Sequence, residues 1–329
     1  MSDSATAAVP PQPFGRRLKR LMSDQPLIPL ILLLVALVVA LQILRPGIVN
    51  PAWIATTIKF AIPLAIFAGC QTMAMLTGGI DLSVGTVATM AAFIVATQGV
   101  YHDPAVAIAI ALTPALVIGL ANGIGIGVFR VHPLIMTLGT GLIGTGFLQV
   151  YQRTVIATGT AVPPGLAWLG TGLTWGIPNA LLLFIPAAAF ILFLLNRTGF
   201  GRLLYAVGDN ERAAKLSGVQ YWQVILVLYV LCSLLAGIAG LLYIGLIKSA
   251  SLSLAEPLVL PSVAAAVIGG TSIFGGRGGY LGSIVGALIL RVLITLLTIL
   301  QMPEGARQIL FGVIVLGVTA AYLRIIEDR

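Results

Sequence analysis

Asp81 has the clearest chemical potential of any residue in this sequence. It lies in the segment LTGGIDLSVG, between the pair Gly78 and Gly79 and a third glycine, within an apolar region. A carboxylate here can accept hydrogen bonds from the free amides of a following helix, a role that Ser83 could share. It can also line a polar pathway through a membrane. The two roles are compatible, and the sequence leaves both open.

Other kinds of chemistry find no support in the residue spacing. None of the four lysines follows a glycine, as a phosphate-binding loop requires, and GTGLIG at residues 139–144 matches the dinucleotide-binding pattern only inside an apolar run. His102 and His132 have no carboxylate or thiol at a ligand spacing. Cys70 and Cys232 lie in apolar runs and are expected to pack. We therefore predict no metal site, no cofactor bound by this chain and no enzymatic activity.

The composition identifies the environment that must position Asp81. The 329 residues are 59% hydrophobic and 9% charged, with a mean hydropathy of +1.07. So little polar surface cannot coat a water-soluble protein of this size. The net charge of +8 comes from basic residues at the ends of apolar segments, so we expect lipid and not nucleic acid as its partner.

An apolar stretch of about 20 residues crosses a bilayer. On that criterion we predict an all-α, polytopic membrane protein with a cytoplasmic tail at 1–26 and a single membrane domain at 27–329. The ten predicted spans are 27–44, 54–76, 82–100, 105–129, 133–151, 176–195, 223–247, 258–275, 279–300 and 306–323.

Basic residues test this count, because they favour the cytoplasmic side. With ten spans and a cytoplasmic N-terminus, the C-terminus is cytoplasmic too. Twelve basic residues then lie in cytoplasmic segments and four in outer segments. The inner set is Arg16, Arg17, Lys19, Arg20, Arg130, Arg197, Arg202, Arg212, Lys215, Arg277, Arg324 and Arg329, and the outer set is Arg45, Arg153, Lys248 and Arg307. Lys59 and Arg291 fall within spans and are possible charge partners of Asp81.

The sequence contains 38 glycines, and their spacing predicts where helices pack closely and where they break. Most of the closely spaced glycines are expected to let helix backbones approach each other in lipid. The pairs Gly78, Gly79 and Gly269, Gly270 are predicted to interrupt helices beside a pathway.

Two connections are long. The outer one, residues 152–175, contains Trp168 and Trp175 and suits an interfacial or short re-entrant segment. The inner one, residues 196–222, is the most polar internal stretch. It predicts a short helix capped by Asp209 or Asn210, with Glu211 in its first turn and Gly218 at its end.

Five motifs in their order and spacing resemble the membrane permease subunit of bacterial ATP-binding cassette (ABC) importers for ribose and related monosaccharides. They are LTGGIDLSVG, GLANG, HPLIMTLGT, GFGRLLYAVGDNERAAKLSG and GGTSIFGGRGGYLGSIVGALI. The resemblance covers nearly the whole chain from about Leu27.

The resemblance implies a multi-pass protein of the bacterial cytoplasmic (inner) membrane. Its partners would be a second permease subunit, a cytoplasmic ATPase that uses ATP and Mg, and a periplasmic sugar-binding protein. The candidates for the translocation pathway are Gln71, Thr72, Asp81, Ser83, Asn122, Thr137 and Thr140. The candidates for docking on the ATPase, in the coupling loop at about 196–222, are Glu211, Arg212, Ala213, Ala214 and Gly218.

Some residues depart from the family pattern. Similar permeases usually have phenylalanine where this chain has Leu134, asparagines where it has Ile294 and Thr295, and often glycine where it has Arg291. These differences argue against ribose itself and leave a small sugar or polyol. An ion-gradient-driven transporter of a small polar solute is the alternative, although only Lys59, Asp81 and Arg291 could couple the ions.

Overall fold

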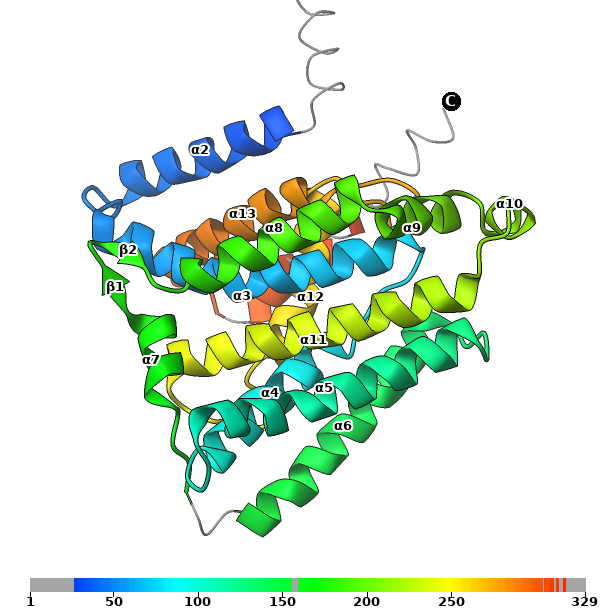
Figure 1. Ribbon diagram of the computed structural model, residues 1–329. Coiled ribbons are helices and arrows are strands. Elements are labelled where there is room, and N and C mark those ends of the chain that lie inside the picture. The colour runs from blue at the N-terminus through cyan, green and yellow to red at the C-terminus, as the bar shows by residue number, and fades with distance from the viewer. Residues whose placement is uncertain (1–26, 156–158, 304, 311, 314–315, 318–329) are drawn as a thin grey trace, which may run out of the picture.

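The structure is a computed structural model that describes residues 27–155, 159–303, 305–310, 312–313 and 316–317. Its helices run side by side (Figure 1). Six of them are long and apolar enough to cross a membrane, and a bent pair, α8 and α9, makes a seventh if it is one span. The six are α2 (Leu27–Leu44), α3 (Pro51–Leu76), α5 (Pro104–Gly127), α6 (Pro133–Val155), α11 (Tyr221–Ile247) and α13 (Tyr280–Ile299).

The remaining elements are shorter. Two apolar ones are α4 (Val84–Gln98) and α12 (Val259–Ile268), the latter preceded by the single-turn η2 (Glu256–Leu258). The bent pair is α8 (Leu181–Arg197) and α9 (Gly199–Asp209), at 66° to each other, and α10 (Glu211–Leu216) follows. In the predicted interfacial connection lie α7 (Pro164–Thr171) and β1 (Leu173–Thr174), and β1 forms a hairpin with β2 (Ile177–Pro178), which lies just beyond it.

The predicted helical, polytopic membrane fold is confirmed at this level. The count of ten spans and the cytoplasmic position of both termini stay predictions. The tail at 1–26 lies outside the described residues, as does much of the predicted span 306–323.

Several predicted boundaries need correction. The span predicted at 258–275 ends at Ile268, because Gly270 adopts φ +88°, a left-handed conformation that continues no helix. The span predicted from 176 begins at Leu181, since the β1–β2 hairpin occupies the residues before it. The span predicted from 54 begins at Pro51, where Asn50 caps the helix by accepting a hydrogen bond from the Trp53 amide at 2.9 Å.

The core forms where α11 packs against α3, α4 and α5, while α13 packs against α3, α12 and α2. Glycines on α5 permit the closest of these contacts. A Cβ added to Gly123 would lie 2.7 Å from the Leu226 Cα, and one on Gly119 would lie 2.9 Å from the Val230 Cα. The prediction that these glycines bring helix backbones together is confirmed. For Gly139 and Gly146 of α6 it stays a prediction, since a Cβ added to either would meet no described atom within 4 Å.

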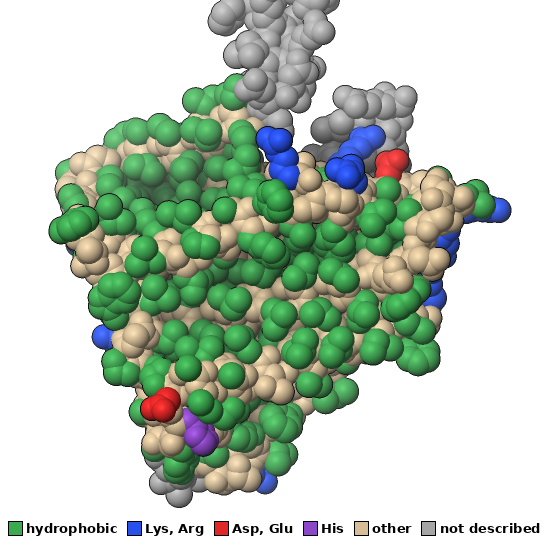
Figure 2. Space-filling view, in the orientation of Figure 1, with side chains coloured by type: hydrophobic (Ala, Val, Ile, Leu, Met, Phe, Trp, Pro, Cys, Tyr) green, Lys and Arg blue, Asp and Glu red, His purple; other side chains and the backbone are tan. Residues whose placement is uncertain are grey.

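The surface has the apolar character that a bilayer requires. Figure 2 shows hydrophobic side chains covering the length of the helices, with basic side chains near the end that carries α9 and α10. Large apolar side chains stand outward on this surface, Ile143 with 74% exposure and Ile43 with 73%. Such exposure is unfavourable in water and favourable in lipid.

Candidate functional site

The loop that contains Asp81 is held from inside the protein. The Gln71 side-chain amide of α3 pairs with the Asp81 backbone, donating to its carbonyl at 2.7 Å and accepting from its amide at 3.2 Å. Asp81 Oδ1 accepts from the Ser83 amide at 2.9 Å and from the Ser83 hydroxyl at 2.6 Å. All three side chains are fully buried. The loop therefore replaces the hydrogen bonds that the broken helix cannot make.

Two further helices join this network. The Asn122 amide of α5 donates to Ser83 Oγ at 3.0 Å and accepts at Oδ1 from the Thr140 hydroxyl of α6 at 2.7 Å. The Leu82 amide donates to Thr137 Oγ1 of α6 at 3.1 Å. Six of the seven pathway candidates thus form one cluster, which we call the Asp81 network: Gln71, Asp81, Ser83, Asn122, Thr137 and Thr140.

Thr72 lies apart from the Asp81 network. Its hydroxyl contacts Ser283 Oγ of α13 at 2.6 Å and bonds its own helix at the Ala68 carbonyl. None of the seven candidates is more than 8% exposed in the isolated chain. Contact between these residues and a transported solute therefore stays a prediction.

The capping role that we predicted for Asp81 takes a different form in the structure. Helix α4 begins at Val84, and the Ser83 side chain makes no cap hydrogen bond. Asp81 Oδ1 accepts the Ser83 amide, one position ahead of the helix. The carboxylate thus fixes the approach to α4 through a local turn.

Tyr229 of α11 is a neighbour of this loop that the sequence analysis missed. A Cβ on Gly79 would lie 2.8 Å from Tyr229 Oη, so only glycine leaves room for the phenol. Tyr229 Oη and Asp81 Oδ2 are both buried without a hydrogen-bond partner among the described residues. A tyrosine within an apolar run gives no sequence signal beyond packing.

Neither basic residue that we considered as a charge partner of Asp81 contacts it among the described residues. The Lys59 ammonium donates to the Thr171 carbonyl at the end of α7. The Arg291 guanidinium lies over the Phe60 ring, 4.4 Å from its centroid.

The inner loop contacts the end of α3 and the loop after α12, next to the two glycine pairs. Gly78, at φ +76°, follows α3, and Gly270 follows α12. Gly276, in the loop after α12, donates to the Leu76 carbonyl at 3.0 Å, and Gly208 of α9 packs against both residues. The Tyr205 hydroxyl of α9 donates to the Gly278 carbonyl at 2.9 Å. The end of α9 therefore touches both helix breaks.

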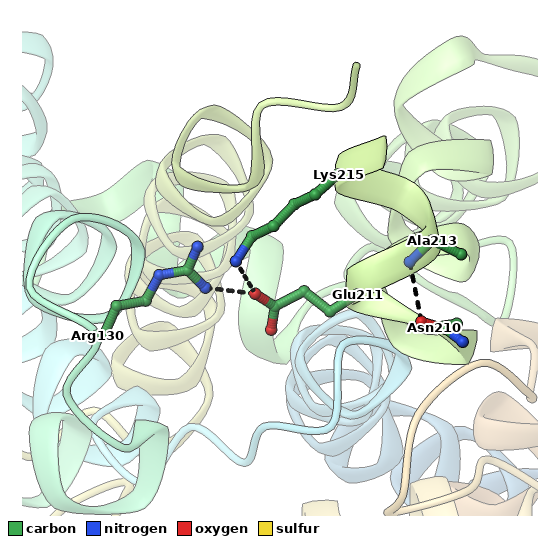
Figure 3. A network of polar contacts seen from close by, with 5 residues as sticks. All are labelled: Arg130, Asn210, Glu211, Ala213 and Lys215. Carbon is green, nitrogen blue, oxygen red and sulfur yellow. Dashed lines mark hydrogen bonds and ion pairs between the residues drawn. The ribbon is translucent and has the colours of Figure 1, made fainter. Parts of the chain in front are cut away.

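Helix α10 has the caps that the sequence predicted. Asn210 Oδ1 accepts the Ala213 amide at 2.9 Å (Figure 3). At the other end Gly218, at φ +86°, donates to the Lys215 carbonyl, and the Val219 amide donates to the Ala214 carbonyl. This is the Schellman arrangement that glycine favours.

Glu211 joins α10 to the rest of the chain. Its carboxylate accepts from Arg130 in the turn between α5 and α6 and from Lys215, both at 2.6 Å (Figure 3). The Arg130 guanidinium also lies over the Tyr221 ring, 3.7 Å from its centroid. Partial burial raises the pKa of Glu211, but the hydrogen bonds and charges of Lys215 and Arg130 outweigh it, so that the pKa is lowered overall.

The other coupling candidates differ in exposure. Arg212, Ala213 and Gly218 are exposed, whereas Ala214 is buried against the chain at 7% exposure. Leu216, which was not a candidate, is 85% exposed at the end of α10. A leucine within a charged loop is the signal that could have identified it.

Comparison with known proteins identifies the family of this chain. Residues 53–319 match the family model described as the permease component of the branched-chain amino acid transport system. The chain belongs to this permease family. No solved structure matches the permease significantly.

The permease is similar to curated relatives over most of their length. The chain is 34% identical to the ribose import permease protein RbsC of Bacillus subtilis, over 85% of this chain and 87% of that protein. It is 34% identical to the galactofuranose transporter permease protein YtfT of Escherichia coli, over 78% and 76%. It is 30% identical to the fructose import permease protein FrcC of Rhizobium meliloti, over 90% and 84%.

These findings confirm the resemblance that the five motifs indicated. The permease is a multi-pass protein of the bacterial cytoplasmic (inner) membrane and a transport subunit, not an enzyme in its own right. Permeases of this kind work with an ATPase and a periplasmic binding protein.

Proposed function

We propose that the permease forms the translocation pathway of an ABC importer for a monosaccharide or similar small polyol. The names of the relatives support this substrate class, since they import ribose, galactofuranose and fructose. A periplasmic binding protein delivers the solute, and a separate cytoplasmic ATPase hydrolyses ATP with Mg. Family membership leaves the ion-gradient alternative without support.

A protein pathway is required because a sugar carries many hydroxyl groups. Each hydrogen bond to water that is lost in hydrocarbon costs on the order of 1–3 kcal/mol when it is not replaced. The binding protein selects the solute, so the membrane pathway needs only to shield it and release it.

The observation that carries the proposal is the position of the coupling segment, residues 199–218. Its first half, α9, touches the ends of both helix breaks through Gly208 and Tyr205. Its second half, α10, is tied by Glu211 to Arg130. The turn at Arg130 joins α5 and α6, which carry Asn122, Thr137 and Thr140 of the Asp81 network. A displacement of this segment by the ATPase has a direct route to the loop at Asp81.

The complete transporter follows from the same proposal. We propose ten membrane spans with cytoplasmic termini, a tail at 1–26 and one permease domain at 27–329. Two permease subunits, identical or closely related, share the pathway. The coupling segment faces the cytoplasm, where Arg212, Ala213 and Leu216 of α10 are exposed for the ATPase.

The test is reconstitution of the permease with its ATPase and binding protein in liposomes. We expect uptake of the sugar recognised by the binding protein to require ATP and to persist when ion gradients are collapsed. Uptake without ATP, or uptake abolished by an ionophore, would contradict an ABC importer.

A further inference from the structure

Arg291 is a charged residue deep in a membrane-spanning helix. It is the twelfth of the 20 residues of α13, about 12 Å or more from either end at 1.5 Å per residue. A hydrocarbon core is about 30 Å thick, so this position is close to its middle. Charged side chains at such depth are rare and face the bundle interior, an aqueous cavity or a counter-charge.

The Arg291 side chain points into the bundle. Its guanidinium carbon lies 4.4 Å from the centroid of the Phe60 ring on α3. A lipid-facing arginine would extend outward and reach for the phosphate headgroups, whereas the Arg291 side chain lies against α3.

Among the described residues, Arg291 has no anionic partner. In the part that the structure describes, no carboxylate forms an ion pair with Arg291, and its Nε is buried without a hydrogen-bond partner. Lys59, the neighbour of Phe60, is a useful contrast. Its ammonium donates to the Thr171 carbonyl at the C-terminus of α7, where a helix attracts positive charge. Lys59 therefore has a hydrogen-bond partner within the chain, whereas Arg291 has none among the residues that the structure describes.

A contact with an aromatic ring does not replace a counter-ion. A cation over a phenylalanine ring gains less free energy than it costs to hold an arginine at the bilayer centre. The guanidinium fork matches the geometry of a carboxylate or phosphate. An anion with two such oxygens would supply the partner that Arg291 lacks among the described residues.

We propose that Arg291, seated on Phe60, is an anion-selective site in the pathway, which receives a carboxylate or phosphate group of the transported solute. The substrate class is then a sugar that carries an acidic group. This inference rests on the proposed pathway function and narrows its substrate.

The test uses the permease alone and measures the charge of the site directly. Cys70 and Cys232, both free thiols, are replaced by alanine, and a cysteine is introduced at Phe60 or at Thr295, one turn beyond Arg291 on α13. Membrane vesicles are treated with two water-soluble thiol reagents of similar size, the anionic sulfonatoethyl and the cationic trimethylammonium-ethyl methanethiosulfonate. The ratio of the two modification rates reports the local potential.

We expect both cysteines to react and to favour the anionic reagent relative to a free thiol in solution. Arg291→Gln should lower that preference by on the order of tenfold, the lower end of the rate effects that focused charge produces. The matched control, Lys59→Gln, should leave it unchanged. Cysteines that resist both reagents, or a preference that survives Arg291→Gln, would overturn the site.

A second measurement in the same vesicles tests whether the solute carries an acidic group. Sodium glucuronate should slow modification of the cysteine at Thr295 more than glucose does at equal ionic strength, and Arg291→Gln should remove the difference. Equal effects of the two sugars, including none, would overturn the assignment of an acidic solute. Because neither ATP, nor the ATPase, nor the binding protein takes part in this experiment, these outcomes are independent of whether uptake requires ATP.

Discussion

Glu211 and Arg130 are 81 residues apart in sequence, and their side chains form a 2.6 Å ion pair. The pair joins α10 to the turn between α5 and α6, and Lys215 supports it from the same helix. Both charged side chains are about two-fifths exposed, so the ion pair is expected to add little to stability. Its proposed role is to link α10 mechanically to α5 and α6.

The first prediction concerns this connection. Glu211→Gln and Arg130→Gln should each reduce ATP-driven uptake several-fold in reconstituted transporter, while the ATPase still binds and hydrolyses ATP. The reason is that either change uncouples α10 from α5 and α6. Lys215→Gln is the matched control, because it removes a charge next to Glu211 but leaves the link to Arg130. Full uptake in both variants would mean that α10 acts by another route.

The pH dependence of this link follows from the lowered pKa of Glu211. A carboxylate whose pKa is depressed on folding contributes its full stabilisation above its ordinary value of 4.5, and loses it as the pH falls through the lowered value. We therefore expect the ratio of uptake by the unmodified chain to uptake by Glu211→Gln to stay constant from neutral pH down to about 5.5. A ratio that falls toward one within that window would show that Glu211 is protonated there and that the link is weaker than its geometry indicates.

Membrane orientation is the next prediction. With Cys70 and Cys232 replaced by alanine, a cysteine at the exposed Asn210 should react with an impermeant reagent only from the cytoplasm, and one at Gly165 only from outside. Gly165 suits this purpose because an added Cβ there meets nothing within 4 Å. Reaction of both from the same side would refute the ten-span arrangement.

The sequence predicts long helices well, because a bilayer demands about 20 apolar residues and that demand is visible in composition. It fails at α12, which was predicted to reach residue 275 and ends at Ile268. Hydropathy measures apolar length and does not register the left-handed turn at Gly270. The same limit applies at α4, where the Asp81 loop precedes a helix of 15 residues.

The sequence likewise predicted some features of the candidate site and not others. Polar types within spans identified Gln71, Asn122 and Thr140 individually, and the structure unites them with Asp81. The ion pair between Glu211 and Arg130 could not be predicted from residue types in this way. Arg130 lies in a distant turn, and nothing in its local sequence points to α10. Contacts between distant segments depend on helix packing, which a single sequence does not encode locally.

Two substitutions at Asp81 are expected to have different effects, because only one of them keeps an acceptor for the Ser83 hydrogen bonds. Asp81→Asn keeps an oxygen that can accept from the Ser83 amide and hydroxyl, so we expect normal amounts of protein and partial uptake. Asp81→Leu leaves both donors buried without an acceptor, at a cost of about 1–3 kcal/mol for each. Its protein level and uptake should both fall sharply, as measured by immunoblot and by transport in cells. Normal uptake by Asp81→Leu would exclude any role for the carboxylate.

The last prediction concerns the surface of α10 that we propose as the docking surface for the ATPase. Leu216 is 85% exposed and Ala213 is exposed, while Ala214 is buried, so we expect the docking surface to contain the first two residues and not the third. Leu216→Asp and Ala213→Arg should therefore release the ATPase during purification, or lower its co-purification about tenfold, without altering the amount of permease in the membrane. Gln220→Glu is the matched control, since it adds negative charge at an exposed neighbouring position without removing an apolar side chain. Ala214→Arg should behave differently, because an arginine at a buried position displaces α10 from the chain and lowers the level of the permease itself. If Leu216→Asp and Ala213→Arg retain the ATPase as fully as Gln220→Glu does, α10 is not the docking helix, and its link to Arg130 serves the permease alone.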